Sequence, residues 1–252
     1  MSFYQRNNMK KIEVLNVKKY FGNLKTLEDI SLYLEENQFV SILGPSGSGK
    51  STLFNIISGL IKPDEGKIII EGKNYIGKTG RVSYMHQKDL LLPWKTIIEN
   101  VCIPLILKGY TKKDAGDKAK KYFDLFGLEG FENHYPSQLS GGMRQRAALL
   151  RTYLFSNDIM LLDEPFGGLD AITKRNMQHW LLSVLENLKS SILFITHDID
   201  EAIFLSDKIY ILSERPAKVK EVVCVDIERP RDNRTFVSEK FNELKENILN
   251  LL

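Results

Sequence analysis

The stretch Gly44–Thr52 contains the residue types with which proteins hold phosphate groups. It matches the pattern G-x-x-x-x-G-K-[ST], a loop whose backbone N–H groups converge on an anion. Gly47 and Gly49 lack a Cβ atom, so the backbone can bend closely around phosphates. Lys50 would neutralise the β- and γ-phosphates, and the Ser51 hydroxyl would hold Mg²⁺. These residues predict a site for a nucleoside triphosphate; a glycine turn without a ligand is the alternative.

The segments on either side of this loop favour the same interpretation. Residues 39–43 form a short apolar run of the kind found in buried strands. Residues 52–60 carry apolar side chains at three- and four-residue spacing, which predicts a helix. Such a helix would point the positive end of its dipole at the anion. We therefore expect a strand, a loop and a helix that together bind phosphate.

A second short motif could bind an anion at the start of another helix. Ser140 is a residue type that caps helix N-termini, and Gly141 and Gly142 would expose backbone N–H groups there. A capped helix with a glycine turn and no ligand is the alternative. The chain thus contains two helix ends that are able to bind phosphate.

Two carboxylates and a histidine follow apolar runs in the second half of the chain. Asp163 and Glu164 end the run 159–164, whose unbroken apolar character suits a parallel strand buried on both faces. The C-terminal ends of such strands face the ligand crevice of an α/β fold. His197 follows the strand expected over residues 191–195. A single histidine is weak evidence for a site, but this position at the end of the next parallel strand strengthens it.

The remaining pattern indicates an α/β fold with additions. Residues 10–43 alternate apolar and polar side chains in short runs, which predicts an antiparallel sheet with one solvated face. Residues 96–153 follow a helical pattern and predict a helical insertion. The lysines between positions 108 and 121 are most simply a solvated helix face, with contact to anionic lipid as the alternative.

The composition limits the classes of protein that are possible. The 252 residues, 27% charged and 43% hydrophobic, are ordinary for a soluble globular protein, and a net charge of +3 gives no argument for nucleic acid. No apolar stretch approaches the ~18 residues of a membrane span, and the first residues lack a secretory signal. We expect an intracellular protein in which Cys102 and Cys224 are reduced and buried.

The segment Leu139–Arg146 reads L-S-G-G-M-R-Q-R and resembles the signature sequence of ATP-binding cassette (ABC) proteins. Asp163 and Glu164 resemble the second nucleotide motif of that family. Gly167–Asp170 resembles the loop through which two ABC subunits contact each other, and His197 resembles the family's switch histidine. Together with the phosphate loop, these motifs identify the chain as a member of the ABC family.

This resemblance, which spans about residues 10–215, implies chemical roles for individual residues. Asp163 would orient the Mg²⁺ shell, and Glu164 would polarise the attacking water as a general base. Gln87 would join Mg²⁺ and the water, and His197 would reach the γ-phosphate.

The resemblance also assigns the base-stacking aromatic residue. Phe21 matches the side chain that stacks on adenine, with Tyr20 as the fallback; the local pattern alone favours core packing of both. The predicted ATP-binding residues are Phe21, Gly44, Pro45, Ser46, Gly47, Ser48, Gly49, Lys50, Ser51, Thr52, Ser140, Gly141, Gly142 and Asp170. The predicted Mg²⁺-binding residues are Ser51, Gln87 and Asp163, and the predicted catalytic residues are Glu164, His197 and Gln87.

The fold implied by the resemblance is α/β, an ABC-type P-loop NTPase with a mixed core sheet, an N-terminal antiparallel β subdomain and an α-helical insertion subdomain. Residues 1–252 are predicted to form one nucleotide-binding domain. Its core would comprise about 10–88 and 156–215, its helical subdomain about 95–153, and its C-terminal tail 216–252.

A narrower resemblance concerns importer ATPases of the nitrate, sulfonate and taurine group, some of whose members handle thiamine-precursor pyrimidines. It rests on Leu92–Trp94, Met143–Arg146, Glu164–Gly167 and Arg229–Arg231. It implies a homodimeric ATPase bound peripherally at the cytoplasmic face of the cell membrane. Transmembrane permease subunits would dock near Gln87–Trp94, and an extracytoplasmic solute-binding protein would act indirectly. In this family the other subunits recognise the solute, so this chain does not identify it.

The sequence is also compatible with other interpretations. The apolar run Leu90–Trp94 either folds back onto the core or meets a partner. A soluble non-transport ABC ATPase, acting on a protein or nucleic-acid assembly, is the alternative function. We expect no nucleic-acid partner, because ABC proteins that act on nucleic acid tend to carry two cassettes or long coiled-coil insertions, and this chain has neither. A small-molecule kinase with a phosphate loop would lack the Ser140–Gly142 signature.

Overall fold

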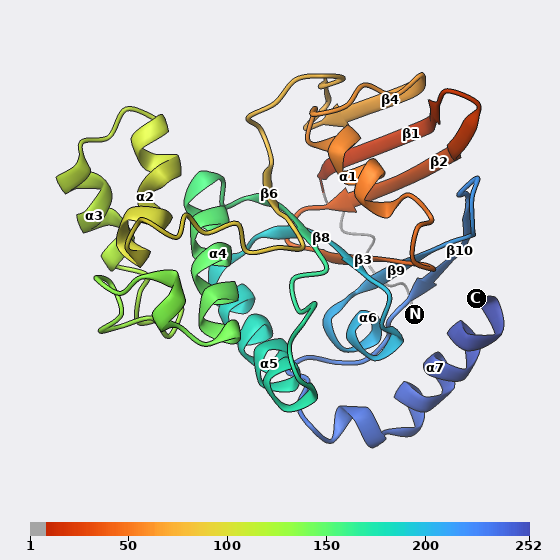
Figure 1. The fold of residues 1–252 in the computed structure, drawn as a ribbon. Helices are drawn as coiled ribbons and strands as arrows, with labels where there is room; N and C mark the ends of the chain where they lie inside the picture. The colour runs from red at the N-terminus through yellow and green to blue at the C-terminus, as the bar shows by residue number, and fades with distance from the viewer. Residues whose placement is uncertain (1–8) are drawn as a thin grey trace. The chain divides into compact units, whose positions relative to one another are not determined.

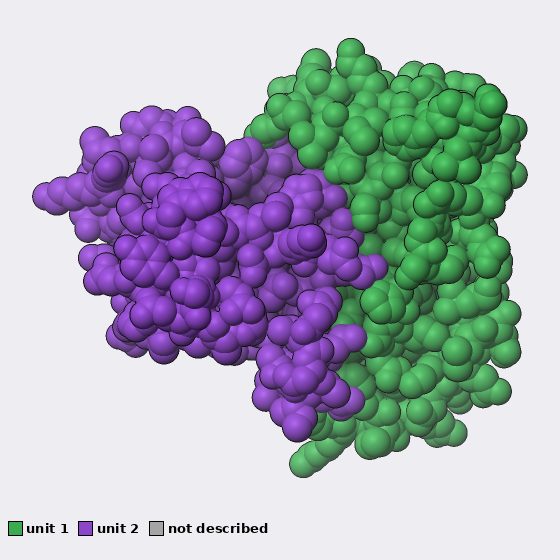
Figure 2. Space-filling view, viewed as in Figure 1, with its two compact units in different colours: residues 1–80, 190–252 green, residues 81–189 purple. Residues whose placement is uncertain are grey.

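The computed structural model describes residues 9–252, without the side chains of residues 185–187. Two compact units make up the chain (Figure 2): unit 1 extends to Gly80 and resumes over Ser190–Leu252, and unit 2 comprises Arg81–Lys189. The sequence of unit 2 is therefore inserted within that of unit 1. Within residues 9–252, no helix combines the length and the apolar character needed to cross a bilayer.

Unit 1 contains an antiparallel sheet of four strands in the order β2-β1-β4-β5 (Figure 1). Its strands are β1 (Lys10–Phe21), β2 (Leu24–Glu35), β4 (Glu65–Ile70) and β5 (Lys73–Asn74). Along β1 the buried residues Ile12, Val14 and Val17 lie between more exposed neighbours. The predicted antiparallel sheet is confirmed for residues 10–35, where side chains alternate between the two faces. Residues 39–43, the end of the predicted range, belong to the second sheet instead.

The second sheet of unit 1 holds its strands in the order β10-β9-β3-β8. These are β3 (Phe39–Leu43), β8 (Ser191–Thr196), β9 (Lys208–Leu212) and β10 (Val219–Cys224). The first three are parallel and buried throughout, whereas β10 pairs antiparallel to β9. Leu43 lies opposite both Thr196 and Ile211, so the loops that follow β3, β8 and β9 leave the sheet at one edge.

The helices of unit 1 follow these strands. They are α1 (Lys50–Ile57), α6 (Ile199–Leu205) and α7 (Glu239–Leu251), with a short 3₁₀ turn at Thr235–Val237. The helix expected over residues 52–60 starts earlier, since its cap is Gly49, and ends earlier, since Gly59 has φ +82°. A left-handed backbone at Gly59 is incompatible with a continued right-handed helix.

Unit 2 contains the parallel pair β6 (Ser83–Met85) and β7 (Ile159–Asp163) together with four helices. The helices are α2 (Ile97–Leu107), α3 (Lys112–Lys120), α4 (Gly141–Phe155) and α5 (Ala171–Leu188), with a 3₁₀ turn at Pro136–Gln138. Thr96 and Glu99 form a capping box at the start of α2. The predicted helical insertion is confirmed by α2, α3 and α4.

The two cysteines differ in environment, contrary to the sequence prediction that both are buried. Cys102 on α2 is buried, and this burial raises the pKa of its thiol to about 11. Cys224 is exposed because it ends β10, an edge strand whose alternate side chains face outward. Val223 and Val225, whose side chains point to the opposite face, are buried, whereas Val222 on the same face as Cys224 is exposed.

Arg231 ties the C-terminal tail to the end of α6. Its Nη1 donates hydrogen bonds to the carbonyl oxygens of Ile203, Phe204 and Ser206 at 2.8–3.0 Å. Its Nε and Nη2 donate to the carbonyl of Ile227. Burial lowers the pKa of this guanidinium to about 10, which still leaves it charged at neutral pH. Carbonyl groups at the C-terminal end of a helix lack hydrogen-bond donors within the helix, and Arg231 provides these donors.

Replacing Arg231 with methionine should lower the free energy of unfolding by about 2–4 kcal/mol, since buried carbonyls lose charged donors. Methionine keeps an unbranched apolar stem but lacks the guanidinium, so the change removes the hydrogen bonds and retains most of the packing of the stem. Thermal denaturation followed by circular dichroism measures the effect. Arg234→Met, at an exposed arginine of the same tail, is the control. Equal midpoints for the two variants would contradict this role.

Candidate functional site

Gly49 and Gly47 give the phosphate loop its shape. The loop lies between β3 and α1, and Gly49 caps α1 with φ +110°. A Cβ atom at Gly49 would lie 2.9 Å from side-chain atoms of both Leu27 and Thr26. Gly47 also has a positive φ, of +78°. Side chains are excluded at Gly49 by conformation and by space, so the pattern of glycines reflects a steric requirement.

Lys50 lies over the phosphate loop. Its Nζ donates hydrogen bonds to the carbonyl oxygens of Gly44 and Pro45, each at 2.8 Å, and the residue is only 5% exposed. The Ser48 hydroxyl is buried and has no hydrogen-bond partner in the described part of the chain. Ser51 is exposed in the first turn of α1. An ammonium, the N–H groups of a helix N-terminus and hydroxyls fit a phosphate chain.

His197 reaches the same edge of the sheet as the phosphate loop. It follows β8, whose last residue Thr196 lies opposite Leu43 at the end of β3. The next residue, Asp198, caps α6 by accepting hydrogen bonds from the N–H groups of Asp200 and Glu201 at 2.9 and 3.2 Å. His197 itself is exposed. The strand and the capped helix thus fix its backbone on both sides.

Phe21 offers an exposed aromatic ring at the end of β1. It is 47% exposed, and Lys19 Nζ lies 5.4 Å from its ring centroid. Tyr20 is half-buried, and its N–H donates to Asp64 Oδ2 at 2.6 Å. Core packing, which the local pattern favoured, does not describe Phe21. Its stacking on adenine stays a prediction.

Arg215 is a residue of this edge that sequence reasoning missed. It lies in the loop after β9, is exposed, and its Nε donates a hydrogen bond to the Gly47 carbonyl. A guanidinium therefore contacts the phosphate loop itself. No local signal indicates this contact, since the two residues are 168 positions apart.

Asp163 and Glu164 follow β7 in unit 2, beside the end of β6. Met85 of β6 lies opposite Leu162, which brings the carboxyl ends of the two strands together. Asp163 is 5% exposed and accepts a hydrogen bond from Tyr84 Oη at 3.1 Å. Burial, and secondarily the charge of Asp163, raises the pKa of Tyr84 far above its usual range. Tyr84 therefore stays protonated and donates to this carboxylate.

Glu164 is held in an unusual backbone conformation. Its φ is +45°, a region that non-glycine residues rarely adopt and that recurs at functional sites. Gln87 Nε2 donates to Glu164 Oε2 at 3.1 Å. The Gly167 N–H donates to the Glu164 carbonyl, which closes a tight turn after β7. The structure thus brings Gln87 and Glu164 into direct contact.

The signature turn begins α4 with a capped and closely packed N-terminus. The Met143 N–H donates to Ser140 Oγ at 3.3 Å. A Cβ at Gly141 would lie 3.3 Å from a methyl carbon of Leu169, and one at Gly142 would lie 3.2 Å from the Thr173 methyl carbon. Both glycines therefore allow the turn to pack against the segment that precedes and starts α5.

Asp170 stabilises the start of α5. Its Oδ1 accepts hydrogen bonds from the N–H groups of Ile172 and Thr173 at 3.1 and 3.0 Å. The hydrogen bonds from Thr173 lower the pKa of this exposed carboxyl. Asp170 thus holds its own loop in place, and its contact with a second subunit stays a prediction.

The predicted site residues are divided between the two units. Unit 1 contains Phe21, Gly44–Thr52 and His197, and unit 2 contains Gln87, Ser140–Gly142, Asp163, Glu164 and Asp170. Within unit 1 the phosphate loop and His197 share a sheet edge. Within unit 2, Gln87 contacts Glu164.

The predicted Mg²⁺ ligands fit the chemistry of that ion. Asp163, Ser51 and Gln87 offer oxygen donors, which Mg²⁺ prefers. Among residues 9–252 no group of three or more His, Cys, Asp or Glu side chains is arranged to hold a metal.

Residues 27–167, more than half of the chain, match the profile of the ABC transporter family. The chain belongs to the ABC transporter family. The predicted family is confirmed. The predictions that the chain binds ATP and is an ATPase are confirmed with it. The match includes the phosphate loop, the signature turn and both carboxylates of this ABC protein.

Three relatives of this ABC protein have names that describe import. The formylaminopyrimidine import ATP-binding protein ThiZ of Halalkalibacterium halodurans is 45% identical over 92% of this chain and 92% of its own length. The aliphatic sulfonates import ATP-binding protein SsuB of Bacillus cereus is 41% identical over 94% of each chain. The nitrate import ATP-binding protein NrtD of Synechocystis is 38% identical over 89% of this chain and 87% of its own.

The fold of this ABC protein also matches solved structures. A dimeric structure of a bacterial ABC transporter cassette aligns with a TM-score of 0.74 and 32% identity, covering 86% of this chain and all of that one. A second structure of that cassette, in a post-hydrolysis state bound to ADP and phosphate, aligns with a TM-score of 0.73 and 31% identity over the same shares of the two chains. The predicted ABC-type α/β fold is confirmed.

Proposed function

We propose that this chain powers the import of a small solute of the nitrate, sulfonate or pyrimidine-precursor type by hydrolysing ATP. The observation that carries the proposal is identity of 38–45% with import ATP-binding proteins along almost the whole chain. These relatives favour import over the alternative of a non-transport ABC ATPase.

The residues of the site have complementary roles in this proposal. Lys50 and the N-terminus of α1 bind the β- and γ-phosphates, and Phe21 stacks on the base. Mg²⁺, held by Ser51, Asp163 and Gln87, would neutralise phosphate charge. Glu164 acts as general base toward the attacking water, a role that typically contributes ~10²–10⁴-fold to a rate. Tyr84 fixes the orientation of the Asp163 carboxylate through its hydrogen bond.

We further propose a head-to-tail homodimer that closes on ATP. The signature turn Ser140–Gly142 of one chain would cover the phosphates held by the Lys50 loop of the other, and His197 would contact the γ-phosphate. ATP that touches both chains only when the dimer is closed binds that state more tightly and so drives closure. The dimeric structure of the related cassette supports this arrangement.

The segment Leu90–Trp94, proposed to meet the permease, divides between core and surface. Leu91 is buried, which agrees with the interpretation that this run folds back onto the core. Leu90 is exposed, and Trp94 is 70% exposed. Large exposed aromatic residues are typical anchors of protein interfaces. The exposure of Trp94 therefore supports docking at this segment. In this proposal the docking takes place on the cytoplasmic face of the membrane.

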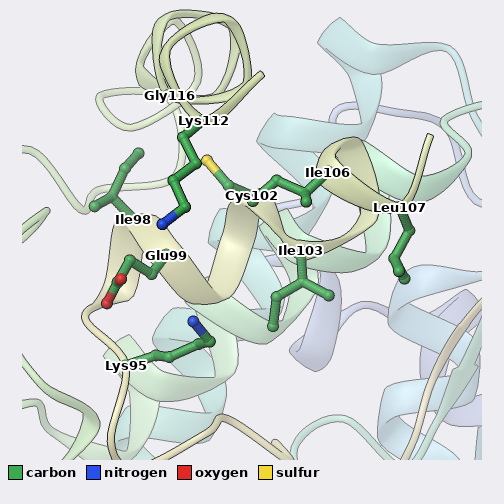
Figure 3. A pocket seen from close by; sticks show the side chains of 9 residues that line it. All are labelled: Lys95, Ile98, Glu99, Cys102, Ile103, Ile106, Leu107, Lys112 and Gly116. Carbon is green, nitrogen blue, oxygen red and sulfur yellow. The ribbon is translucent and has the colours of Figure 1, made fainter. Parts of the chain in front are cut away.

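Unit 2 also contains an apolar pocket whose lining includes the residue after Trp94. Lys95, the next residue, lines this pocket of about 310 Å³ between α2 and α3 (Figure 3). The pocket is lined by Lys95, Ile98, Glu99, Cys102, Ile103, Ile106, Leu107, Lys112 and Gly116. Leu107 at its edge is 79% exposed. Its apolar walls with charged groups at the rim suit a short amphipathic helix of a permease.

Replacing Trp94 with alanine should remove most of the permease-stimulated ATPase activity, because the exposed ring anchors the interface. Loss of such an anchor typically costs ≥2 kcal/mol of binding energy, or about 30-fold in affinity. The measurement compares hydrolysis by the isolated chain with hydrolysis by the detergent-solubilised complex that copurifies with the tagged chain from its own membranes.

The control is Leu249→Ala, which removes an exposed apolar side chain on α7. The ATPase rate of the isolated chain should be unchanged in both variants. Activity that no membrane partner stimulates, even in the wild type, would overturn the importer function. Stimulation that survives Trp94→Ala would remove this residue from the interface.

A further inference from the structure

Two arginines of α4 hold the docking loop, defined here as Asp89–Trp94. Arg151 Nη1 donates to the Leu90 carbonyl at 2.8 Å, and Arg151 Nη2 donates to the Asp89 carbonyl at 2.5 Å. Leu90 has φ +47°, a costly conformation for a non-glycine residue. One guanidinium thus bridges two successive carbonyls at the point where the backbone bends.

Arg144 connects the same loop to the signature turn. Its Nε lies 3.3 Å from Asp89 Oδ2 in an ion pair. Its Nη1 donates to the Leu139 carbonyl at 2.7 Å. Leu139 directly precedes Ser140, the cap of α4. Arg144 therefore contacts both the docking loop and the residue that leads into the signature turn.

The other end of the docking loop is bonded to α2 through a buried side chain. Asn100 is fully buried, and its Oδ1 accepts a hydrogen bond from the Leu92 N–H at 2.7 Å. Its Nδ2 donates to the carbonyls of Leu92 and Lys95, each at 3.1 Å. The backbone of the loop is thus held on both sides while Trp94 projects outward. A loop bonded in this way moves as a unit with its supports rather than bending on its own.

We propose that Arg144 and Arg151 couple the docking loop to the signature turn, so that a permease pressing on Trp94 displaces α4. This inference rests on the proposed importer function and adds the residues that transmit its regulation. All of the contacts lie within unit 2. An arginine that makes two charged contacts transmits a displacement better than a side chain that makes one. Breaking both contacts would leave partly buried polar groups unpaired, so the contacts tend to stay intact during the movement. Arg144 and Arg151 act as positioning residues and touch no reacting atom.

Arg151→Lys tests the coupling. Lysine keeps the charge, but its single ammonium lacks the planar fork that bridges the carbonyls of Asp89 and Leu90. The permease-stimulated rate should fall at least ~5-fold, the lower end of usual coupling between sites. The basal rate and the amount of permease that copurifies should match the wild type. The control is Arg234→Lys, at an exposed arginine of the tail.

Asp89→Asn provides a second test that leaves Arg151 in place. Asparagine can still accept the hydrogen bond that the Leu91 N–H donates to Asp89, but it loses the charge that faces Arg144. Stimulation should fall again, whereas Asp117→Asn, at an exposed position of α3, should not change it. Arg144→Gln removes this ion pair and also the bond to the Leu139 carbonyl, so adding Asp89→Asn to Arg144→Gln should cause no loss beyond that of Arg144→Gln alone.

The outcomes separate this inference from the proposed function. A wild-type complex without stimulation would overturn the importer function and the coupling together. Stimulation that is lost in Trp94→Ala but complete in Arg151→Lys and Asp89→Asn would overturn the coupling alone. Equal losses of stimulated and basal activity would show a general structural role for these residues and would also overturn it.

Discussion

Replacing Glu164 with glutamine should lower the rate of ATP hydrolysis by about 10²–10⁴-fold, because the amide cannot take a proton from the attacking water. Glutamine has the shape of glutamate, and its side-chain oxygen can still accept the hydrogen bond from Gln87 Nε2. ATP binding should therefore persist. Release of phosphate under single-turnover conditions measures the chemical step without a contribution from product release.

The same variant should accumulate as a dimer in the presence of ATP. Hydrolysis is the step that reopens the proposed closed dimer, so blocking it leaves ATP held between two chains. Size-exclusion chromatography with and without ATP shows the dimer directly. Glu246→Gln, at an exposed glutamate of α7, is the matched control and should hydrolyse ATP normally. Normal turnover by Glu164→Gln would show that another group activates the water.

Replacing Lys50 with methionine should weaken ATP binding by about 100-fold or more. The ammonium is the side-chain cation of the phosphate loop, and a hydrogen bond to a charged group contributes about 1.5–3 kcal/mol. Two such bonds to the β- and γ-phosphates correspond to more than two powers of ten in affinity. Methionine approximates the length of the lysine chain, so the change removes the charge with little loss of packing.

Isothermal titration with ATP at constant Mg²⁺ measures this loss. Lys67→Met, at an exposed lysine of β4, keeps the change in net charge the same and should bind ATP as the wild type does. Thermal denaturation of both variants detects any effect of losing the bonds from Lys50 to the Gly44 and Pro45 carbonyls. A folded Lys50→Met chain with wild-type affinity would contradict the assigned role.

The sequence by itself determined the features that depend on residues close to one another along the chain. Glycines at positions 47 and 49 predicted a loop that only glycine can form, and both have positive φ. The unbroken apolar run of β7 predicted a buried strand, and all of its residues are buried. Ser140 predicted a helix cap, and its hydroxyl accepts the hydrogen bond of a cap. Each of these depends on neighbours within a few positions, where backbone conformation follows from residue type.

Only the tertiary structure decided which distant residues support the site. Tyr84 contacts Asp163 because the register of β6 against β7 brings them together. Arg215 contacts Gly47 because β9 lies beside β3. Arg151 reaches Asp89 across 62 positions. Strand register and the reach of long side chains fix these contacts, and both follow from packing of the whole core rather than from any local pattern.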